Sequence, residues 1–360
     1  MRIGVPRETT AGERRVGLVP ESVTRLKKAG VDVRVQRGAG TSAYVTDEAY
    51  AAAGAELVDD ASAVFGDCDV ICKVQRPSPA ESALVREGAL LISLLQPSSS
   101  ADTLEALNAR RVTALALERV PRITRAQSMD ILSSQATVAG YKAVLLAATH
   151  TSKLLPMLTT AAGNIPPAKA FVVGAGVAGL MAIATARRLG AVVSGYDVRA
   201  AAREQVLSLG ATFIGPEPQA DAEAAGGYAR EQTEEEKAKT LAALAAHVTT
   251  QDLIITTAQI PGRPAPRIIT AEMVHSMRPG TVLIDMAAET GGNCELTVAG
   301  EVVDVNGVTI VGAVNLPSST PYHASVMFSK NVLTLLQHMI KDGALGLNLE
   351  DEIIGPMCVA

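Results

Sequence analysis

The sequence is poor in the residues that recognise nucleic acid or build metal and disulfide sites. It has no tryptophan, and aromatic residues make up only 3% of it, which leaves few surfaces for stacking bases. The net charge is −5 and no basic cluster stands out, so nucleic acid is a poor candidate partner. The four cysteines form no C-x-x-C pair, which predicts buried reduced thiols and no metal site.

Long apolar runs and a leader sequence are also lacking. Apolar residues make up 48% of the chain, but they are spread through short runs, and no uninterrupted stretch is long enough to span a bilayer. The first six residues resemble a strand rather than the apolar core of a secretory signal. We therefore expect a soluble cytoplasmic protein, and its 360 residues predict two domains.

The first 120 residues alternate short apolar runs with helical patterns. The runs at 2–5, 31–35, 69–74, 90–95 and 112–117 predict strands, and the segments 21–28, 47–53 and 101–110 predict helices between them. This alternation is typical of a parallel α/β unit. It has no glycine fingerprint of its own.

The second half begins with a long helical pattern, from 133 to about 155, rich in small residues and predicted to join two domains. Strands are then expected at 170–173, 252–256, 281–285 and 308–311, and an amphipathic run at 324–341 is expected to return to the first domain. The fold class predicted is α/β, with two Rossmann-like doubly wound parallel sheets and a cleft between them. The predicted domains are 1–130 with 320–360, and 131–319.

The most informative motif is the glycine pattern at Gly174, Gly176 and Gly179, between a predicted strand and a predicted helix. These glycines suit a tight turn, close approach to a pyrophosphate and close helix packing, with the phosphates at the helix N-terminus. Asp197 follows the next strand near the spacing of a ribose-binding acid. It favours NAD over NADP, although Arg199 nearby could serve a 2′-phosphate.

A polar segment at 221–239 interrupts the α/β rhythm. It contains Gly226, Gly227 and Tyr228, followed by several glutamates. A solvated surface loop is one interpretation. A glycine-hinged lid that closes over bound nucleotide is the other, and we favour it because loops of this length are uncommon without a role.

A second polar segment, residues 121–133, precedes the long helix, and we call it the polar loop. Its glutamine, Gln127, could pair with a nicotinamide carboxamide or a ribose, while an arginine and an aspartate could hold each other and the loop. Equally, Asp130 or Ser133 could be only the N-cap of the helix. The residues alone leave both interpretations open.

Four segments together resemble the NAD(H)-binding component of proton-translocating nicotinamide nucleotide transhydrogenase: RAQSMD at 125–130, SSQA at 133–136, the glycine pattern, and YDVR at 196–199. The segments 225–229 and 256–262 resemble that family's mobile loop and a turn near its cofactor. The resemblance covers nearly the whole chain. It implies that Arg122, Gln127, Asp130 and Ser133 act beside the nicotinamide, and that NAD(H) is contacted by Gln127, Ser128, Met129, Asp130, Gly174, Gly176, Val177, Gly179, Asp197, Val198, Arg199, Gly227, Tyr228 and Gln259.

The resemblance also implies partners. Hydride would pass to NADP⁺ held by a separate component, coupled to proton movement through a membrane-spanning one. The chain would be a soluble subunit, a homodimer, peripheral at the cytoplasmic face of the inner membrane and not inserted into it.

Alanine dehydrogenase is a competing resemblance, carried by GVPRE at 4–8 and RRV at 14–16. Lys73 and Arg15 stand at positions matching that family's lysine and arginine. Its catalytic histidine is matched by Gln96 and its aspartate by Glu289. A neutral glutamine cannot act as an acid near pH 7, whereas hydride exchange between two nicotinamides needs no proton relay.

The five histidines, at 150, 247, 275, 323 and 338, do not cluster in the sequence. Each suits a surface or core position better than a catalytic one. A third possibility is a cofactor-binding protein with no catalysis of its own, which overlaps with the first, because an isolated subunit would bind NADH and do nothing further.

Overall fold

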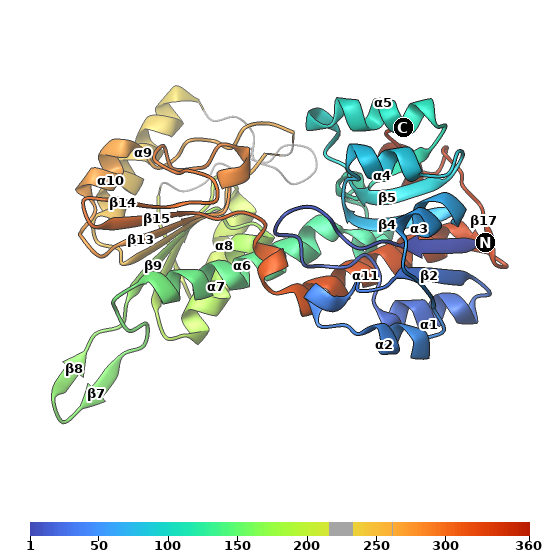
Figure 1. Ribbon diagram of the computed structural model, residues 1–360. Helices are drawn as coiled ribbons and strands as arrows, with labels where there is room; N and C mark the ends of the chain where they lie inside the picture. The colour runs from blue at the N-terminus through green and yellow to red at the C-terminus, as the bar shows by residue number, and fades with distance from the viewer. Residues whose placement is uncertain (216–232, 261) are drawn as a thin grey trace. The chain divides into compact units, whose positions relative to one another are not determined.

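The structure is a computed structural model that describes residues 1–215, 233–260 and 262–360 (Figure 1). The chain divides into two compact units. The first is Met1–Gln135 with Pro317–Ala360, and the second is Ala136–Leu316. The division falls inside the long helix α6 (Ile131–His150). The first unit is therefore assembled from both ends of the chain.

The first unit is built on a six-stranded parallel sheet with the order β3-β2-β1-β4-β5-β6. The strand order reverses between β1 and β4, and in such sheets ligand sites form beyond the carboxyl ends of the strands at that point. The strands are β1 (Arg2–Val5), β2 (Asp32–Gln36), β3 (Glu56–Val58), β4 (Val70–Gln75), β5 (Leu90–Leu94) and β6 (Thr113–Ala116).

Helices cover both faces of this sheet, because successive strand residues point to opposite faces. Ile3 and Val5 belong to a core shared with the C-terminal helix α11 (Pro321–Met339), whereas Ile71 and Leu91 belong to a second core on the other face. The other helices are α1 (Pro20–Lys28), α2 (Asp47–Ala52), α3 (Ala61–Asp67), α4 (Pro79–Leu84), α5 (Ala101–Ala109) and α12 (Ile354–Met357), with 3₁₀ turns η1 (Thr41–Ala43), η2 (Pro97–Ser99), η3 (Leu117–Arg119) and η4 (Thr124–Met129), and a short hairpin β16 (Ile340–Lys341)–β17 (Ala344–Leu345).

The second unit carries a seven-stranded sheet with the order β11-β10-β9-β12-β13-β15-β14, in which only the edge strand β14 is antiparallel. The order reverses at β9, which lies between β10 and β12 and leads into the glycine pattern. The strands are β9 (Lys169–Val173), β10 (Val192–Tyr196), β11 (Thr212–Phe213), β12 (Leu253–Thr256), β13 (Val282–Asp285), β14 (Val302–Val305) and β15 (Val308–Gly312).

Two cores again flank the sheet: Ala170 and Val172 of β9 belong to one, and Phe171 and Val173 to the other. A hairpin, β7 (Leu158–Thr160) and β8 (Gly163–Ile165), projects from the body of this unit (Figure 1). The helices are α7 (Val177–Arg188), α8 (Ala200–Ser208), α9 (Glu234–Val248) and α10 (Ala271–Ser276), with 3₁₀ turns η5 (Ala288–Thr290) and η6 (Leu316–Ser319), the latter at the division between the units.

The small residues of α6 are explained by its packing on α7. A Cβ atom at Gly140 would lie 2.1 Å from the carbonyl oxygen of Ala178, so the two helices approach at backbone distance there. Among the described residues, α6 is the one helix long and apolar enough to cross a membrane by length and composition, although no uninterrupted apolar run produces this. In its most apolar stretch 44% of the residues are buried, and a single helix of this kind is weak evidence of a membrane span.

The predicted fold class, two doubly wound α/β sheets, is confirmed. The long helix ends at His150 and not near 155, because the chain then turns into β7. The segment 221–239 is not a loop throughout, since α9 begins at Glu234. The short strands β3, β11 and β14, the hairpin β7–β8, and the helices α3 and α4 were not predicted from the sequence. The cleft between the units stays a prediction.

Candidate functional site

The glycine pattern forms a tight loop, residues 174–179, held between the ends of three strands. Gly174 has φ +95°, and its N–H donates to the Tyr196 carbonyl at 2.8 Å. Its carbonyl accepts from Thr257 Oγ1 at 3.0 Å. A Cβ atom at Gly174 would lie 2.6 Å from the same Thr257 Oγ1. Both the backbone conformation and the space therefore require glycine.

Gly179 and Gly176 have different reasons to be glycine. A Cβ atom at Gly179 would lie 1.8 Å from the Gly174 carbonyl oxygen, so helix α7 can pack on the loop only without a side chain there. Gly176, the N-cap of α7, has an ordinary φ of −76°, and the nearest atom to its Cβ position is Arg199 Nη2 at 4.0 Å. Nothing in the described chain requires glycine at Gly176, whereas a phosphate approaching the helix N-terminus would. The loop therefore fits the pyrophosphate of a dinucleotide.

Asp197 is buried, and its carboxylate is fully engaged by the chain. Oδ2 accepts from the N–H of Ala175 in the glycine loop at 2.7 Å and from Arg199 Nη2 at 2.9 Å. Oδ1 accepts from the backbone N–H and Nε of Arg199, both at 2.9 Å. Asp197 and Arg199 thus form a bidentate ion pair, in which the charges of the carboxylate and the guanidinium largely cancel. The acid predicted to bind ribose also fixes the glycine loop.

The turn after β12 is clamped by a side chain that no sequence pattern revealed. Asn293 accepts from the N–H of Ala258 at 3.0 Å and donates to the Ala258 carbonyl and to that of Pro266, each at 2.8 Å. The neighbouring Gln259 is exposed and donates to the Met286 carbonyl at 3.1 Å. Asn293 therefore fixes the backbone that carries Gln259.

In the first unit the polar loop is anchored at its apolar positions. Ala126 and Met129 are buried in the core, whereas Arg122, Gln127 and Ser128 are exposed. The loop thus presents polar side chains between two buried anchors. Met129 contributes its side chain to that support.

Asp130 caps helix α6, one of the two roles left open by the sequence. Its Oδ1 accepts from the N–H of Ser133 at 3.0 Å, and its Oδ2 accepts from Ser133 Oγ at 2.6 Å. Arg125 forms an exposed ion pair with Glu352 at 2.7 Å. The cap fixes the C-terminal end of the polar loop, whereas an ion pair as exposed as that of Arg125 contributes little.

Lys73 and Arg15 lie in a buried ionic network at the switch point of the first sheet. Lys73 Nζ lies 3.1 Å from Glu8 and 3.2 Å from Glu81. Arg15 pairs with Glu13 at 2.7 Å. Both cations are thus paired with carboxylates of their own chain.

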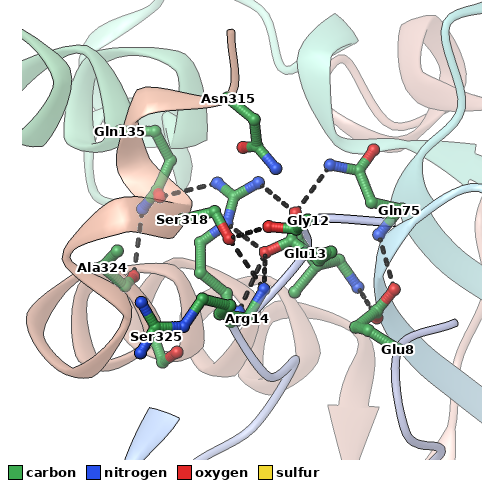
Figure 2. Close-up of polar contacts among 12 residues, drawn as sticks. Glu8, Gly12, Glu13, Arg14, Gln75, Gln135, Asn315, Ser318, Ala324 and Ser325 are labelled. Atoms are coloured by element: carbon green, nitrogen blue, oxygen red, sulfur yellow. Dashed lines mark hydrogen bonds and ion pairs between the residues drawn. The ribbon is translucent and has the colours of Figure 1, made fainter. Parts of the chain in front are cut away.

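Two glutamines connect this network to its surroundings. Gln75 joins Glu8 to Glu13, donating to them at 3.3 Å and 2.8 Å (Figure 2). Gln135 accepts from Arg15 Nη1 at 2.9 Å and donates to the Ala324 carbonyl of α11 at 3.1 Å.

Ser318 bridges the backbone of Gly12 and Arg14, which closes the turn that carries Glu13.

The pKa values of Glu8 and Glu13 shift in opposite directions. Burial raises the pKa of Glu8 more than the charge of Lys73 lowers it. Burial acts in the same sense on Glu13, but hydrogen bonds and charge from Arg15 outweigh it and lower its pKa to about 2. Glu13 therefore stays ionised as the counter-ion of Arg15.

Gln96 is exposed at the end of β5 in a left-handed conformation, with φ +49°. Glu118 holds it there by accepting from the N–H groups of Gln96 and Leu95. Glu289 is also exposed, and it accepts from the N–H of Asn315 at 3.3 Å. The side chain of Gln96 is a neutral amide.

Two predicted site residues, Gly227 and Tyr228, lie outside the described residues, as does most of the predicted lid. Within residues 1–215, 233–260 and 262–360, no group of three or more His, Cys, Asp or Glu side chains is arranged to hold a metal ion. The described residues build a glycine loop at the switch point of a doubly wound sheet, with a shape that suits the pyrophosphate of a dinucleotide.

The chain belongs to the alanine dehydrogenase/PNT family. Residues 4–139 match the model described as alanine dehydrogenase/PNT, N-terminal domain, and residues 143–360 match the corresponding C-terminal domain.

Relatives from both branches of the family are similar to it. An NAD(P) transhydrogenase alpha subunit of Rhodospirillum rubrum is 49% identical, over 100% of this chain and 96% of that protein. The crystal structure of transhydrogenase from Sinorhizobium meliloti has a TM-score of 0.91 and 46% identity, covering 99% of this chain and 98% of that one. Alanine dehydrogenase of Mycobacterium tuberculosis is 32% identical, over 89% of this chain and 82% of that protein.

Proposed function

We propose that this chain is the NAD(H)-binding subunit of a proton-translocating NAD(P) transhydrogenase. In this proposal a hydride passes between NADH on this chain and NADP⁺ on a partner component. The 49% identity to a transhydrogenase alpha subunit along the whole chain supports it. Similarity to alanine dehydrogenase is lower, at 32%.

The second unit would hold the cofactor. Gly174, Gly176 and Gly179 shape the loop, and the first turn of α7 offers backbone N–H groups to the pyrophosphate. Asp197, with Val198 and Arg199, would face the adenosine ribose, while Val177 and Gln259 offer exposed side chains near the loop and the turn after β12. NADH, when bound, supplies the hydride.

The polar loop would position the nicotinamide. Gln127 presents both an amide donor and an acceptor, which match a carboxamide or a ribose hydroxyl. Arg122, Asp130 and Ser133 would act with it, and the bond between Asp130 and Ser133 keeps this end of the loop in place. Ser128 and Met129 would contact the cofactor through the same segment. Gly227 and Tyr228 stay predictions of a closing lid.

Two observations favour transhydrogenation over alanine dehydrogenation. Gln96 is neutral, and Lys73 and Arg15 are already paired with carboxylates. Reductive amination needs an acid to protonate the substrate and a cation free for its carboxylate. Gln96 cannot supply the acid, and Lys73 and Arg15 are held by Glu8, Glu81 and Glu13. Hydride exchange between two nicotinamides requires only alignment and exclusion of water.

The proposal includes an assembly. The partners are an NADP(H)-binding subunit and a membrane-spanning subunit, and this chain forms a homodimer. It lies at the cytoplasmic face of the inner membrane without inserting into it.

The test compares two reactions of the purified chain. With NADH, pyruvate and ammonium alone, we expect tight NADH binding and no steady oxidation. With an NADP(H)-binding component and NADP⁺ added, we expect NADH-dependent NADP⁺ reduction. Steady alanine formation by the chain alone would establish an amino-acid dehydrogenase and overturn the proposal.

A further inference from the structure

Asn331, on the C-terminal helix α11, contacts the polar loop, although the sequence separates them by 203 positions. Its Nδ2 donates to the carbonyl of Ser128 at 2.7 Å. Its Oδ1 accepts from Ser134 Oγ on the first turn of α6, also at 2.7 Å. A single amide thus joins α11, the polar loop and the start of α6.

The amide orientation follows from its partners. A backbone carbonyl can only accept a hydrogen bond, so the NH₂ group must face Ser128 and the oxygen must face the hydroxyl of Ser134. Asn331 is 8% exposed, and its neighbours Val332 and Leu335 are fully buried, so its backbone is fixed by the core. Such a group costs free energy if its partners are removed, and it has two well-formed bonds here.

The bond reaches the loop at an exposed stretch. Ala126 and Met129 anchor the loop in the core, while Gln127 and Ser128 between them are exposed. The Ser128 carbonyl therefore lies on a stretch that packing alone does not hold. Fixing that carbonyl fixes the peptide plane after Ser128 and restricts the backbone next to Gln127.

We infer that Asn331 is a positioning residue for the nicotinamide-binding side of the proposed reaction, acting through the Ser128 carbonyl. Its kinetic consequence rests on the proposed function; its effect on loop order does not. Hydride transfer depends steeply on alignment, and a displacement of about 1 Å can cost roughly 100-fold in rate. Cofactor affinity depends on the sum of many contacts and is less sensitive to one loop.

The test uses Asn331→Leu, with Ser329→Ala as the matched control. Ser329 lies on the same helix, is fully buried, accepts from the N–H of Val19 at 2.9 Å and donates to Ser22 at 2.7 Å, all away from the loop. Both variants should lower Tm. Only Asn331→Leu should accelerate amide hydrogen exchange at residues 127–130. The expected acceleration is about tenfold, because it corresponds to the free energy of one lost hydrogen bond.

With the partner component present, Asn331→Leu should lower kcat for hydride transfer by about tenfold or more and change KM for NADH by less than about threefold. Asn331→Asp adds a rescue. A protonated carboxyl can donate to the Ser128 carbonyl and an ionised one cannot. Transfer by Asn331→Asp, relative to the unsubstituted protein, should therefore recover as the pH falls, whereas Asn331→Leu should show no recovery.

Unchanged exchange at 127–130 in Asn331→Leu would overturn the inference, whatever the rates. Faster exchange with the same kcat as Ser329→Ala would also overturn it, because the loop would then be loosened without consequence. If the unsubstituted protein transfers no hydride to the partner's NADP⁺, the proposed function fails instead, and exchange at 127–130 still decides whether Asn331 orders the loop.

Discussion

Replacing Asp197 by alanine should change which dinucleotide the chain prefers. The carboxylate is held by four hydrogen bonds, three from Arg199 and one from Ala175. Removing it takes a partner from the glycine loop and releases the Arg199 guanidinium toward a 2′-phosphate. NADH binding should weaken while NADPH binding strengthens.

The expected magnitude comes from the hydrogen bond between Asp197 and Ala175, because that bond orders the glycine loop proposed to bind the pyrophosphate. Hydrogen bonds to charged groups contribute about 1.5–3 kcal/mol, and about 1.4 kcal/mol is tenfold in Kd. We expect Asp197→Ala to raise the Kd for NADH by about 10- to 100-fold. The ratio of the NADPH and NADH constants should shift by more than that, because Arg199 then attracts the phosphate.

Fluorescence titration with each nucleotide measures both constants, and the absence of tryptophan keeps protein emission low. Arg199→Ala is the matched control: it leaves the carboxylate without that cation and should sharpen discrimination against NADPH. If both variants change the two constants by a common factor, the pair plays no part in choosing the nucleotide and the prediction is wrong.

Four further outcomes can be checked. Gly176→Val should have a free energy of unfolding within about 1 kcal/mol of that of the unsubstituted protein, because its Cβ position meets no atom closer than 4.0 Å. It should nevertheless lose NADH binding, because the side chain would occupy the place of a phosphate, and an unchanged Kd would contradict a phosphate there. Gly174→Ala should instead lower Tm, since φ is +95° and Thr257 Oγ1 lies 2.6 Å from the Cβ position. Gln127→Asn should slow hydride transfer to the partner's NADP⁺ much more than it weakens NADH binding, because a shorter amide misplaces the ring; equal losses in both would count against it. The lowered pKa of Glu13 adds stability that is present above its ordinary value of 4.5 and is lost as the pH falls toward about 2. Urea unfolding of Glu13→Gln should lack that acid-dependent component, worth about 3 kcal/mol, and an unchanged pH dependence would refute it.

The glycine loop could be predicted from the sequence because its causes are local. Gly174, Gly176 and Gly179 lie within one strand–turn–helix unit, so their spacing alone reveals the loop. The contact of Gly174 with Thr257 depends on a residue far away in the sequence. The parallel sheets were predictable for the same reason, since each strand–helix repeat is contiguous. Short strands such as β3 and β11 were missed because two or three residues carry no readable alternation.

The ionic network was harder to foresee. Lys73 and Arg15 were noticed by resemblance, but Glu8, Glu13 and Glu81 become their partners only when strands and loops distant in sequence meet. Asn331 and Asn293 are similar cases, because an asparagine on a helix or in a turn has no pattern that reveals a distant backbone partner. Asp130 was left open between two roles, and its capping role required the geometry of α6.

The return of α11 to the first unit sets an order of events during synthesis. Residues 136–316 are contiguous and can complete their own sheet as soon as they leave the ribosome, whereas the first unit lacks Phe328, Val332 and Leu336 of its core until the end of the chain emerges. Residues 1–135 are thus made before the second unit but complete their core only after it. A nascent chain stopped before residue 321 should display the apolar face of the first sheet to chaperones, and the same chain extended by one helix should not.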